Sequence, residues 1–263
     1  KSAPVADVVF GIDNTFAGRA FSEGVLSPYT SAALPAGAAP YAADASNRLA
    51  PSDYGDGRLH ADTAWFRAKG LAVPATLDDL LKPEYRDLLV VANPATSSPG
   101  LAFLLTTIAA KGEAGYLDYW KALRDNGLKV VKGWTEAYTV EFSGSSGKGK
   151  RPLVLSYASS PAFEPATESL NQTCFRQIEY AGVVAGSANQ VGAGKFIDFL
   201  LSAQVQAEIP DQMYMYPVDS SVKLPKEWAA HAVLPEHPFT LPPAQISAGR
   251  DAWIKAWTAA VIG

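Results

Sequence analysis

Lys132-Gly133-Trp134-Thr135-Glu136-Ala137-Tyr138 is the stretch around which the rest of this sequence is organised. It follows an apolar, β-prone run at 128–131, and a second such run at 153–155 leads into Leu155-Ser156-Tyr157-Ala158-Ser159-Ser160-Pro161. In both places a strand gives way to a turn, which is where open α/β sheets carry their ligand-binding groups. We therefore predict that Trp134 and Tyr157 stand at the rim of one crevice.

Two aromatic faces at such a rim favour a flat, positively charged ligand. An aromatic ring attracts a cationic ring by stacking and through its quadrupole, with roughly 0.5 to 2 kcal/mol per contact. The alternative is that Trp134 and Tyr157 are ordinary half-buried packing residues, and composition alone does not separate the two readings.

Composition limits the class of protein. A chain of 263 residues can form two domains or one large α/β unit. The net charge of -4 and the lack of any Lys/Arg run argue against a nucleic-acid partner. The single cysteine, Cys174, excludes an intrachain disulfide framework. No apolar run reaches the roughly 18 residues that span a membrane, and the first residues lead almost at once into a strand, so we expect no signal peptide here.

Strands alternate with helices along the chain, which predicts a largely parallel α/β architecture. Asp13 or Asn14 is expected to cap a short helix that ends near Phe21, at the carboxyl edge of the sheet. Another helix is expected to open at Thr76. The stretch 54–62 should be a strand by position, although polar residues interrupt it. We predict further strands at 88–91, 128–131, 152–156 and 176–185, and helices at 101–110, 114–124, 134–142, 191–201, 203–209 and 242–262. Trp253 and Trp257 share one face of the last helix, and we expect this face to dock against the rest of the protein and not to bind a ligand.

A hydroxyl-rich turn, Asn93-Pro94-Ala95-Thr96-Ser97-Ser98-Pro99-Gly100, precedes the helix at 101–110. Hydroxyls and free backbone N–H groups at a helix N-terminus form an anion site, so Ser97 and Ser98 are candidate contacts for a phosphate or hydroxyl group. The alternative is that one serine only caps the helix. The later loop at 143–150 has linker composition, and it lacks the GxxxxGK[ST] spacing of a phosphate-binding loop.

The sequence favours binding over catalysis. His60, His231 and His237 lack metal-ligand spacing, so we expect no metal site and no cofactor. Cys174 is a candidate nucleophile whose pKa Arg176 would lower, but a small buried apolar residue is the favoured interpretation.

Seven segments together resemble the thiamine-binding proteins of bacterial ABC importers, which belong to the two-lobed periplasmic solute-binding proteins. The matching segments are 6–14, 53–55, 96–100, 132–138, 154–157, 160–162 and 215–218. The resemblance runs over nearly the whole chain, and its most specific segments are those that contain Trp134 and Tyr157.

The resemblance implies roles for individual residues. The thiamine rings would lie among the aromatics Trp134 and Tyr157, and the Ser97-Ser98 turn would face the hydroxyethyl or phosphate end. Ala158, Ser159 and Ser160 would hydrogen-bond the ligand. The thiazolium ring is a permanent cation, which suits cation–π stacking. The resemblance also adds four ligand-binding candidates: Asp13, Asn14, Tyr54 and Tyr214.

The sequence departs from the family pattern in three places. Family members begin with a strand, a helix and a second strand that this sequence lacks, which indicates a fragment or part of an engineered fusion. Relatives run an apolar strand where this chain has Gly57-Arg58-Leu59-His60, and an unpaired Arg58 would repel a cation by about 1 kcal/mol or more. Tyr214 occupies a position that is usually Trp.

The resemblance implies an α/β, two-lobed type II periplasmic-binding fold with a hinge between the lobes. We expect residues 1–62 to form part of lobe 1, 63–205 mainly lobe 2, and 206–263 a return to lobe 1 with C-terminal helices. The implied protein is a monomeric, non-enzymatic carrier of thiamine, thiamine monophosphate or thiamine pyrophosphate. It would act in the periplasm or outside the cell, lipid-anchored in some precursors, and deliver its ligand to a membrane ABC permease.

Three rival readings stay open. The first is a relative or engineered variant tuned to another small cationic heteroaromatic ligand. The second is a ferric-iron binder, for which Tyr214 and Tyr216, alternate positions of one strand, are a weak indication. The third is a thiaminase-like enzyme with Cys174 as its nucleophile.

Overall fold

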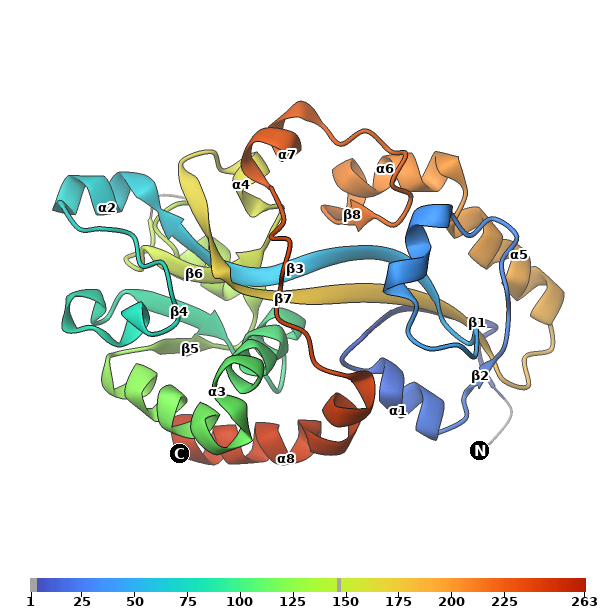
Figure 1. Ribbon diagram of the computed structural model, residues 1–263, viewed down its shortest axis with the longest axis horizontal. Coiled ribbons are helices and arrows are strands. Elements are labelled where there is room, and N and C mark those ends of the chain that lie inside the picture. The colour runs from blue at the N-terminus through green and yellow to red at the C-terminus, as the bar shows by residue number, and fades with distance from the viewer. Residues whose placement is uncertain (1–3, 146–147) are drawn as a thin grey trace. The chain divides into compact units, whose positions relative to one another are not determined.

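The computed structural model describes residues 4–145 and 148–263, and it is a mixed α/β structure (Figure 1). Eight strands form one hydrogen-bonded sheet in the order β1-β7-β3-β6-β4-β5, with β2 paired to β7 and β8 paired to β3. The chain divides into two compact units. Unit 1 comprises residues 1–55, 177–225 and 242–248, and unit 2 comprises residues 56–176, 226–241 and 249–263.

Unit 1 contains one end of each of the two strands that continue into unit 2. Its elements are β1 (Val8–Asp13), α1 (Ala17–Ser22), β2 (Leu26–Ser27), the 3-10 helix η1 (Ala36–Tyr41), the first part of β3 (Ala50–Asp62), the last part of β7 (Thr167–Val184), α5 (Gln190–Leu200), α6 (Ala203–Met213), β8 (Tyr216–Pro217) and the first turns of α8 (Pro243–Val261).

Unit 2 holds the rest of β3, β7 and α8. Its other elements are α2 (Thr63–Lys69), the 3-10 helices η2 (Asp79–Leu81) and η3 (Pro83–Tyr85), β4 (Leu89–Ala92), α3 (Ser98–Asp125), β5 (Lys129–Val131), the π-helical segment η4 (Glu136–Glu141), β6 (Leu153–Tyr157), α4 (Ser160–Phe163) and α7 (Lys226–His231).

The chain passes between the units inside two neighbouring strands, β3 and β7, which Figure 1 shows as the two long strands. The crossing points are 55/56 and 176/177. The lobe boundaries expected from the sequence lie at other positions, residues 62 and 205, and they stay a prediction. A unit boundary that falls inside a continuous strand cannot be located from local composition, because no turn or linker in the sequence marks it.

The core of unit 1 lies on both faces of β1 and β7. One cluster contains Ala181, Val183, Ala193 and Ile197, so it joins β7 to α5. The other contains Ala17 and Tyr180, with Val9 and Ile12 packed against it, so it joins the sheet to α1. Alternate residues of a strand face opposite sides, and this alternation places one core on each face.

The core of unit 2 is formed by parallel strands and the long helix α3. β4 pairs in parallel with both β5 and β6, and all four of its residues are buried. α3 contains non-helical Gly112 (φ 72°, ψ 167°), so it is the two helices expected from the sequence, joined at a kink. Trp257 of α8 packs edge-on against Trp120 of α3, with ring centroids 5.3 Å apart, which confirms the docking role expected for the tryptophans of the last helix.

Several expectations from the sequence were wrong. The sheet is not largely parallel, since β1–β7, β2–β7, β3–β6 and β3–β8 are antiparallel. Neither Asp13 nor Asn14 caps α1, which begins after Phe16 without a side-chain cap. Thr76 opens only a 3-10 turn, because the Asp79 carboxylate closes a local turn by accepting from the N–H groups of Ala75 and Thr76.

Strand direction follows from which segments meet in space, so propensity along the chain does not reveal it. The stretch 54–62 is part of β3 as position suggested. Residues 146 and 147 of the loop predicted at 143–150 lie outside the described residues. Within the described ranges, no helix is both long enough and apolar enough to cross a membrane.

Candidate functional site

Trp134 lies in unit 2, directly after β5, in the turn that leads into η4. Its ring is partly exposed and stacks on Tyr138, with centroids 5.1 Å apart and planes 14° apart. The indole Nε1 donates to Ser156 Oγ at 2.8 Å, and Ser156 Oγ lies 2.7 Å from Ser160 Oγ. The Trp134 indole and the hydroxyls of Ser156 and Ser160 therefore form one chain of hydrogen bonds, which fixes the orientation of the Trp134 ring. The ring is a preformed stacking surface.

Tyr138 supports that surface from the protein interior. It is buried, and its ring also packs against Phe142 at 5.5 Å. Burial raises the pKa of Tyr138 to about 12, with the Glu164 charge adding to the effect, so its phenol stays neutral. Val90, Val131 and Val154 complete the same cluster. A stacking ring backed by a packed core loses little conformational entropy when it binds a ligand.

Tyr157 ends β6 and is partly exposed, and the three residues after it are buried. Ala158 uses its N–H to donate to the Asp56 carbonyl at 2.8 Å, and its carbonyl accepts from Arg58 Nη2 at 3.0 Å. Protein groups therefore already engage the backbone of Ala158. Ser160 begins α4 with its hydroxyl beside Ser156. The hydrogen bond from Trp134 to Ser156 joins the two motifs, and a common crevice lined by Trp134 and Tyr157 stays a prediction.

The Ser97-Ser98 turn opens α3. Ser97 is its N-cap and accepts from the Gly100 N–H at 3.5 Å, whereas Ser98 is exposed. A Cβ at Gly100 would lie 2.4 Å from the Ala92 carbonyl oxygen, so only glycine fits this close approach to β4. Thr96 Oγ1 donates to the Lys132 carbonyl at 2.7 Å and joins this turn to the one that holds Trp134. Capping occupies one lone pair of Ser97 and leaves Ser98 at the helix N-terminus.

Repulsion of a cationic ligand was expected only from an unpaired Arg58, and the Arg58 guanidinium is hydrogen-bonded within the protein. Its side chain is fully buried. It donates to Asn171 Oδ1 at 2.8 Å, to the Val233 carbonyl at 2.9 Å and to the Ala158 carbonyl at 3.0 Å. A guanidinium with several acceptors can be buried at tolerable cost. Arg58 thus anchors the turn that follows Tyr157.

Asp56 and His60 lie two residues before and after Arg58 on β3. Asp56 is fully buried and accepts from Arg176 Nε at 2.5 Å. Burial raises the pKa of Asp56, although the charges of Arg176 and Arg58 oppose that shift. Burial, with the nearby Arg58 charge, lowers the pKa of His60 well below its ordinary value, so His60 is neutral. These polar residues are tolerated within β3 because each bonds to a residue of another segment: Asp56 to Arg176, Arg58 to Asn171, and His60 to Ser169.

Unit 1 contains the other four candidates. Asp13 ends β1, and its Oδ1 accepts from the backbone N–H and the hydroxyl of Thr15. Asn14 Oδ1 accepts from the Ile178 N–H at 3.2 Å. Both side chains therefore stabilise the turn at the carboxyl end of β1, the position predicted for them, and their ligand role stays a prediction.

Tyr54 and Tyr214 differ in their surroundings. Tyr54 stacks on Tyr41 at 4.3 Å and on Tyr216 at 5.5 Å, so it has a packing role. Tyr214 is 53% exposed and ends α6 in the left-handed conformation (φ 58°, ψ 31°). Such a backbone is uncommon for a bulky side chain and accompanies functional sites. Because Tyr214 is a helix terminus and Tyr216 a buried strand residue, the expectation that they share one strand was wrong.

Sequence reasoning missed an acidic cluster in unit 1. Asp53 is fully buried, and Glu179 stands opposite Asp13 in the β1–β7 register. Burial, and then the charge of Glu179, raises the pKa of Asp53 to about 7. Burial and the charge of Asp13 also raise the pKa of Glu179. The sequence signal was the presence of acidic residues within strands, where they are unusual.

Comparison with known proteins gives the family. The model of a family described as bacterial extracellular solute-binding protein matches residues 3–239. This chain belongs to that family. The match covers most of both units, and the two-lobed type II periplasmic-binding fold expected from the sequence is confirmed.

Individual relatives of this solute-binding protein are known. The chain is 31% identical to the "Thiamine-binding periplasmic protein" of Escherichia coli (strain K12), over 97% of the chain and 76% of that protein. It is 30% identical to the protein of the same description from Brucella melitensis biotype 1, over 98% of the chain and 76% of that protein. A solved structure described as a periplasmic thiamin binding protein matches with a TM-score of 0.81 and 29% identity, over 97% of this chain and 79% of the other.

The thiol of this solute-binding protein is not placed for catalysis. Cys174 lies inside β7 and is fully buried. Burial raises the pKa of Cys174 to about 12 and outweighs the charges of Arg58 and Arg176, which act to lower it as expected for Arg176. A nucleophilic cysteine needs an accessible thiolate. The described ranges, 4–145 and 148–263, contain no cluster of three His, Cys, Asp or Glu side chains that could hold a metal ion.

Proposed function

We propose that this solute-binding protein captures thiamine, or one of its phosphate esters, in the periplasm or outside the cell and delivers it to a membrane ABC permease. The observation that carries the proposal is the Trp134 ring, held by Tyr138 and Ser156 as a preformed stacking surface. The names of the most similar relatives, which are thiamine-binding periplasmic proteins, support the same ligand.

The chemistry of thiamine suits unit 2. Its thiazolium ring carries a permanent charge, and a Trp face attracts such a ring more strongly than Phe or Tyr does. Tyr157 would add a second aromatic contact, and Ser159 and Ser160 would supply hydroxyl contacts. Ala158 would contribute through the second lone pair of its carbonyl, since Asp56 and Arg58 already engage its backbone.

The turn before α3 suits the other end of the ligand. Ser98 is exposed beside the N-terminus of a long helix, where N–H groups and the helix dipole favour an anion. We therefore propose that Ser97 and Ser98 contact the hydroxyethyl or phosphate group. The proposed contacts from unit 1 are Asp13, Asn14, Tyr54 and Tyr214, and we propose that the protein acts as a monomer.

Isothermal titration of the purified protein with thiamine, thiamine monophosphate and thiamine pyrophosphate tests the proposal. We expect saturable binding, and we expect Trp134→Ala to weaken it by about 30-fold or more, equivalent to about 2 kcal/mol. Trp65→Ala is the matched control, because Trp65 is also partly exposed in unit 2 but packs against Phe66 on α2. Comparison of the three ligands identifies the preferred phosphorylation state.

Two results would contradict the proposal. One is unchanged affinity in Trp134→Ala, which would remove the stacking surface from the site. The other is the absence of binding for all three ligands by a folded protein. In that case, titration with other small cationic heteroaromatic compounds would test the rival reading of a changed ligand.

A further inference from the structure

Glu164 lies one helical turn from the hydrogen-bonded cluster that holds Trp134. α4 begins at Ser160, whose hydroxyl lies 2.7 Å from Ser156 Oγ, and Glu164 follows the last residue of this helix. The Glu164 N–H donates to the Ser160 carbonyl at 3.0 Å. Residues four positions apart on a helix share one face, so Glu164 stands on the face of α4 that carries the Ser160 side chain.

The backbone of Glu164 is also fixed from the other side. Thr167, which is buried and begins β7, donates to the Glu164 carbonyl twice. Its N–H does so at 2.9 Å and its hydroxyl at 2.7 Å. Because α4 and β7 both hold this position, the Glu164 carboxylate acts from a defined place in unit 2 and not from a mobile loop.

The carboxylate of Glu164 is unpaired. Within residues 4–145 and 148–263 it has neither an ion pair nor a hydrogen bond, although it is partly buried. Burial raises the pKa of Glu164, because water solvates the charge less well than at an open surface. The charge also reaches the stacked rings of Tyr138 and Trp134, since after burial it is the second cause that raises the pKa of Tyr138.

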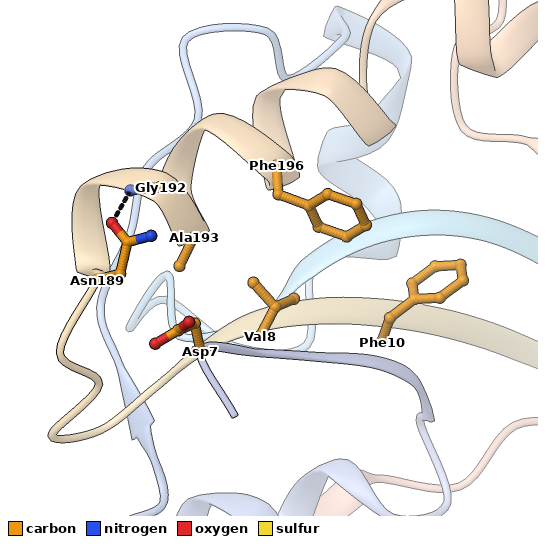
Figure 2. Close-up of a pocket in the computed structure, with 7 residues that line it drawn as sticks. All are labelled: Asp7, Val8, Phe10, Asn189, Gly192, Ala193 and Phe196. Carbon is orange, nitrogen blue, oxygen red and sulfur yellow. Dashed lines mark hydrogen bonds between the residues drawn. The ribbon is translucent and has the colours of Figure 1, made fainter. Parts of the chain in front are cut away.

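A hollow in unit 1 gives the contrasting case. It measures about 450 Å³, lies between the start of β1 and α5, and contains the carboxylate of Asp7 (Figure 2). Asp7 accepts from Ser187 Oγ at 2.6 Å, and Asn189 accepts from the Gly192 N–H at 3.0 Å. Protein donors therefore satisfy the polar groups of that hollow, whereas the described part of the chain supplies none to Glu164.

A second carboxylate near Trp134 belongs to Glu136. It is exposed, and its Oε2 accepts from the Lys132 N–H at 3.3 Å. Water screens an exposed charge, so Glu136 should act on a neighbouring cation only weakly. Glu164 is less exposed and unpaired, and its charge therefore acts more strongly on a ligand at Trp134.

We propose that Glu164 supplies the counter-charge for the cationic ring that stacks on Trp134, and that it makes the site select a positively charged ring over a neutral ring of the same shape. This inference rests on the proposed function, which brings a thiazolium to Trp134. An aromatic face alone also binds neutral flat rings, whereas a carboxylate discriminates by charge. The unpaired charge costs free energy in the empty site, and a bound cation offsets that cost.

Two ligands and two variants separate charge from packing. The ligands are thiamine and its thiophene analogue, in which a neutral ring of nearly the same shape replaces the thiazolium. The variants are Glu164→Gln and the matched control Glu136→Gln, each of which removes one charge with little change in size. Isothermal titration at low ionic strength measures both affinities, and thermal unfolding without ligand measures Tm.

We expect Glu164→Gln to weaken thiamine binding by about 5- to 10-fold and to change binding of the thiophene analogue by about 2-fold or less. Glu136→Gln should change either affinity by about 2-fold or less. The Tm of Glu164→Gln should equal or exceed that of the parent, because the substitution removes an unpaired charge from a partly buried position. A purely structural residue would lower Tm and weaken both ligands together.

Two results would overturn the inference about Glu164 alone. Equal losses of affinity for thiamine and the thiophene analogue in Glu164→Gln would give Glu164 a packing role. Thiamine affinity that is unchanged in Glu164→Gln, or lowered equally in both glutamine variants, would mean that Glu164 is not the counter-charge. In each case the parent still binds thiamine. Absence of thiamine binding by the folded parent would instead overturn the proposed function, and this inference with it.

Discussion

The buried carboxyl of Asp53 should make the stability of this protein depend on pH, and Asp53→Asn should remove that dependence. Asp53 Oδ2 accepts from Ser52 Oγ at 2.7 Å, and within residues 4–145 and 148–263 its Oδ1 has no hydrogen-bond partner. Burial, with the charge of Glu179, raises the pKa of Asp53 from 3.8 to about 7. The folded protein therefore favours the neutral carboxyl.

The sign follows from proton linkage. Between about pH 4 and pH 7 the folded state binds a proton at Asp53 that the unfolded state has lost, so the free energy of unfolding falls as pH rises. The contribution is fully present below the unfolded pKa and is lost as pH rises through the folded pKa. A difference of about 3 pH units at about 1.4 kcal/mol each gives about 4 kcal/mol as an upper bound, and on the order of 2 kcal/mol after relaxation of the site.

Urea denaturation at pH 3, 5 and 8 measures the effect. Asp53→Asn is an uncharged analogue of the protonated acid, so its stability should equal that of the parent at pH 3, below the unfolded pKa, and exceed it by about 2 kcal/mol at pH 8. Asp211→Asn, at an exposed position on α6, is the control. A parent and an Asp53→Asn variant with parallel pH profiles would refute the reasoning, because the carboxyl would then be ionised in the fold.

Two substitutions near the candidate site give further predictions. Ser156→Ala leaves the indole N–H of Trp134 without its acceptor, so the free energy of unfolding should fall by about 1 to 3 kcal/mol in urea denaturation, and thiamine affinity should fall less than in Trp134→Ala. No change in either quantity would mean that Ser156 does not orient the ring. Tyr214→Gly relieves a left-handed backbone that costs a non-glycine residue roughly 1 kcal/mol, so Tm should rise or hold while titration shows weaker thiamine binding. Lower stability with unchanged affinity would make Tyr214 a packing residue.

The sequence by itself determined the features that depend on neighbours along the chain. The turns after β5 and β6 and the hydroxyl-rich start of α3 were predicted, because a strand end and a helix cap are set by a few adjacent residues. The motifs that contain Trp134 and Tyr157 also indicated the family that the comparisons show.

Only the tertiary structure decided which groups meet. The bond from Trp134 to Ser156, the burial of Arg58 against Asn171 and the antiparallel direction of most strands each join segments far apart in the chain. A charged residue in a strand looks the same in sequence whether it faces a ligand or is buried among acceptors. The difference is the desolvation and hydrogen bonding supplied by distant segments, and these exist only in the folded protein.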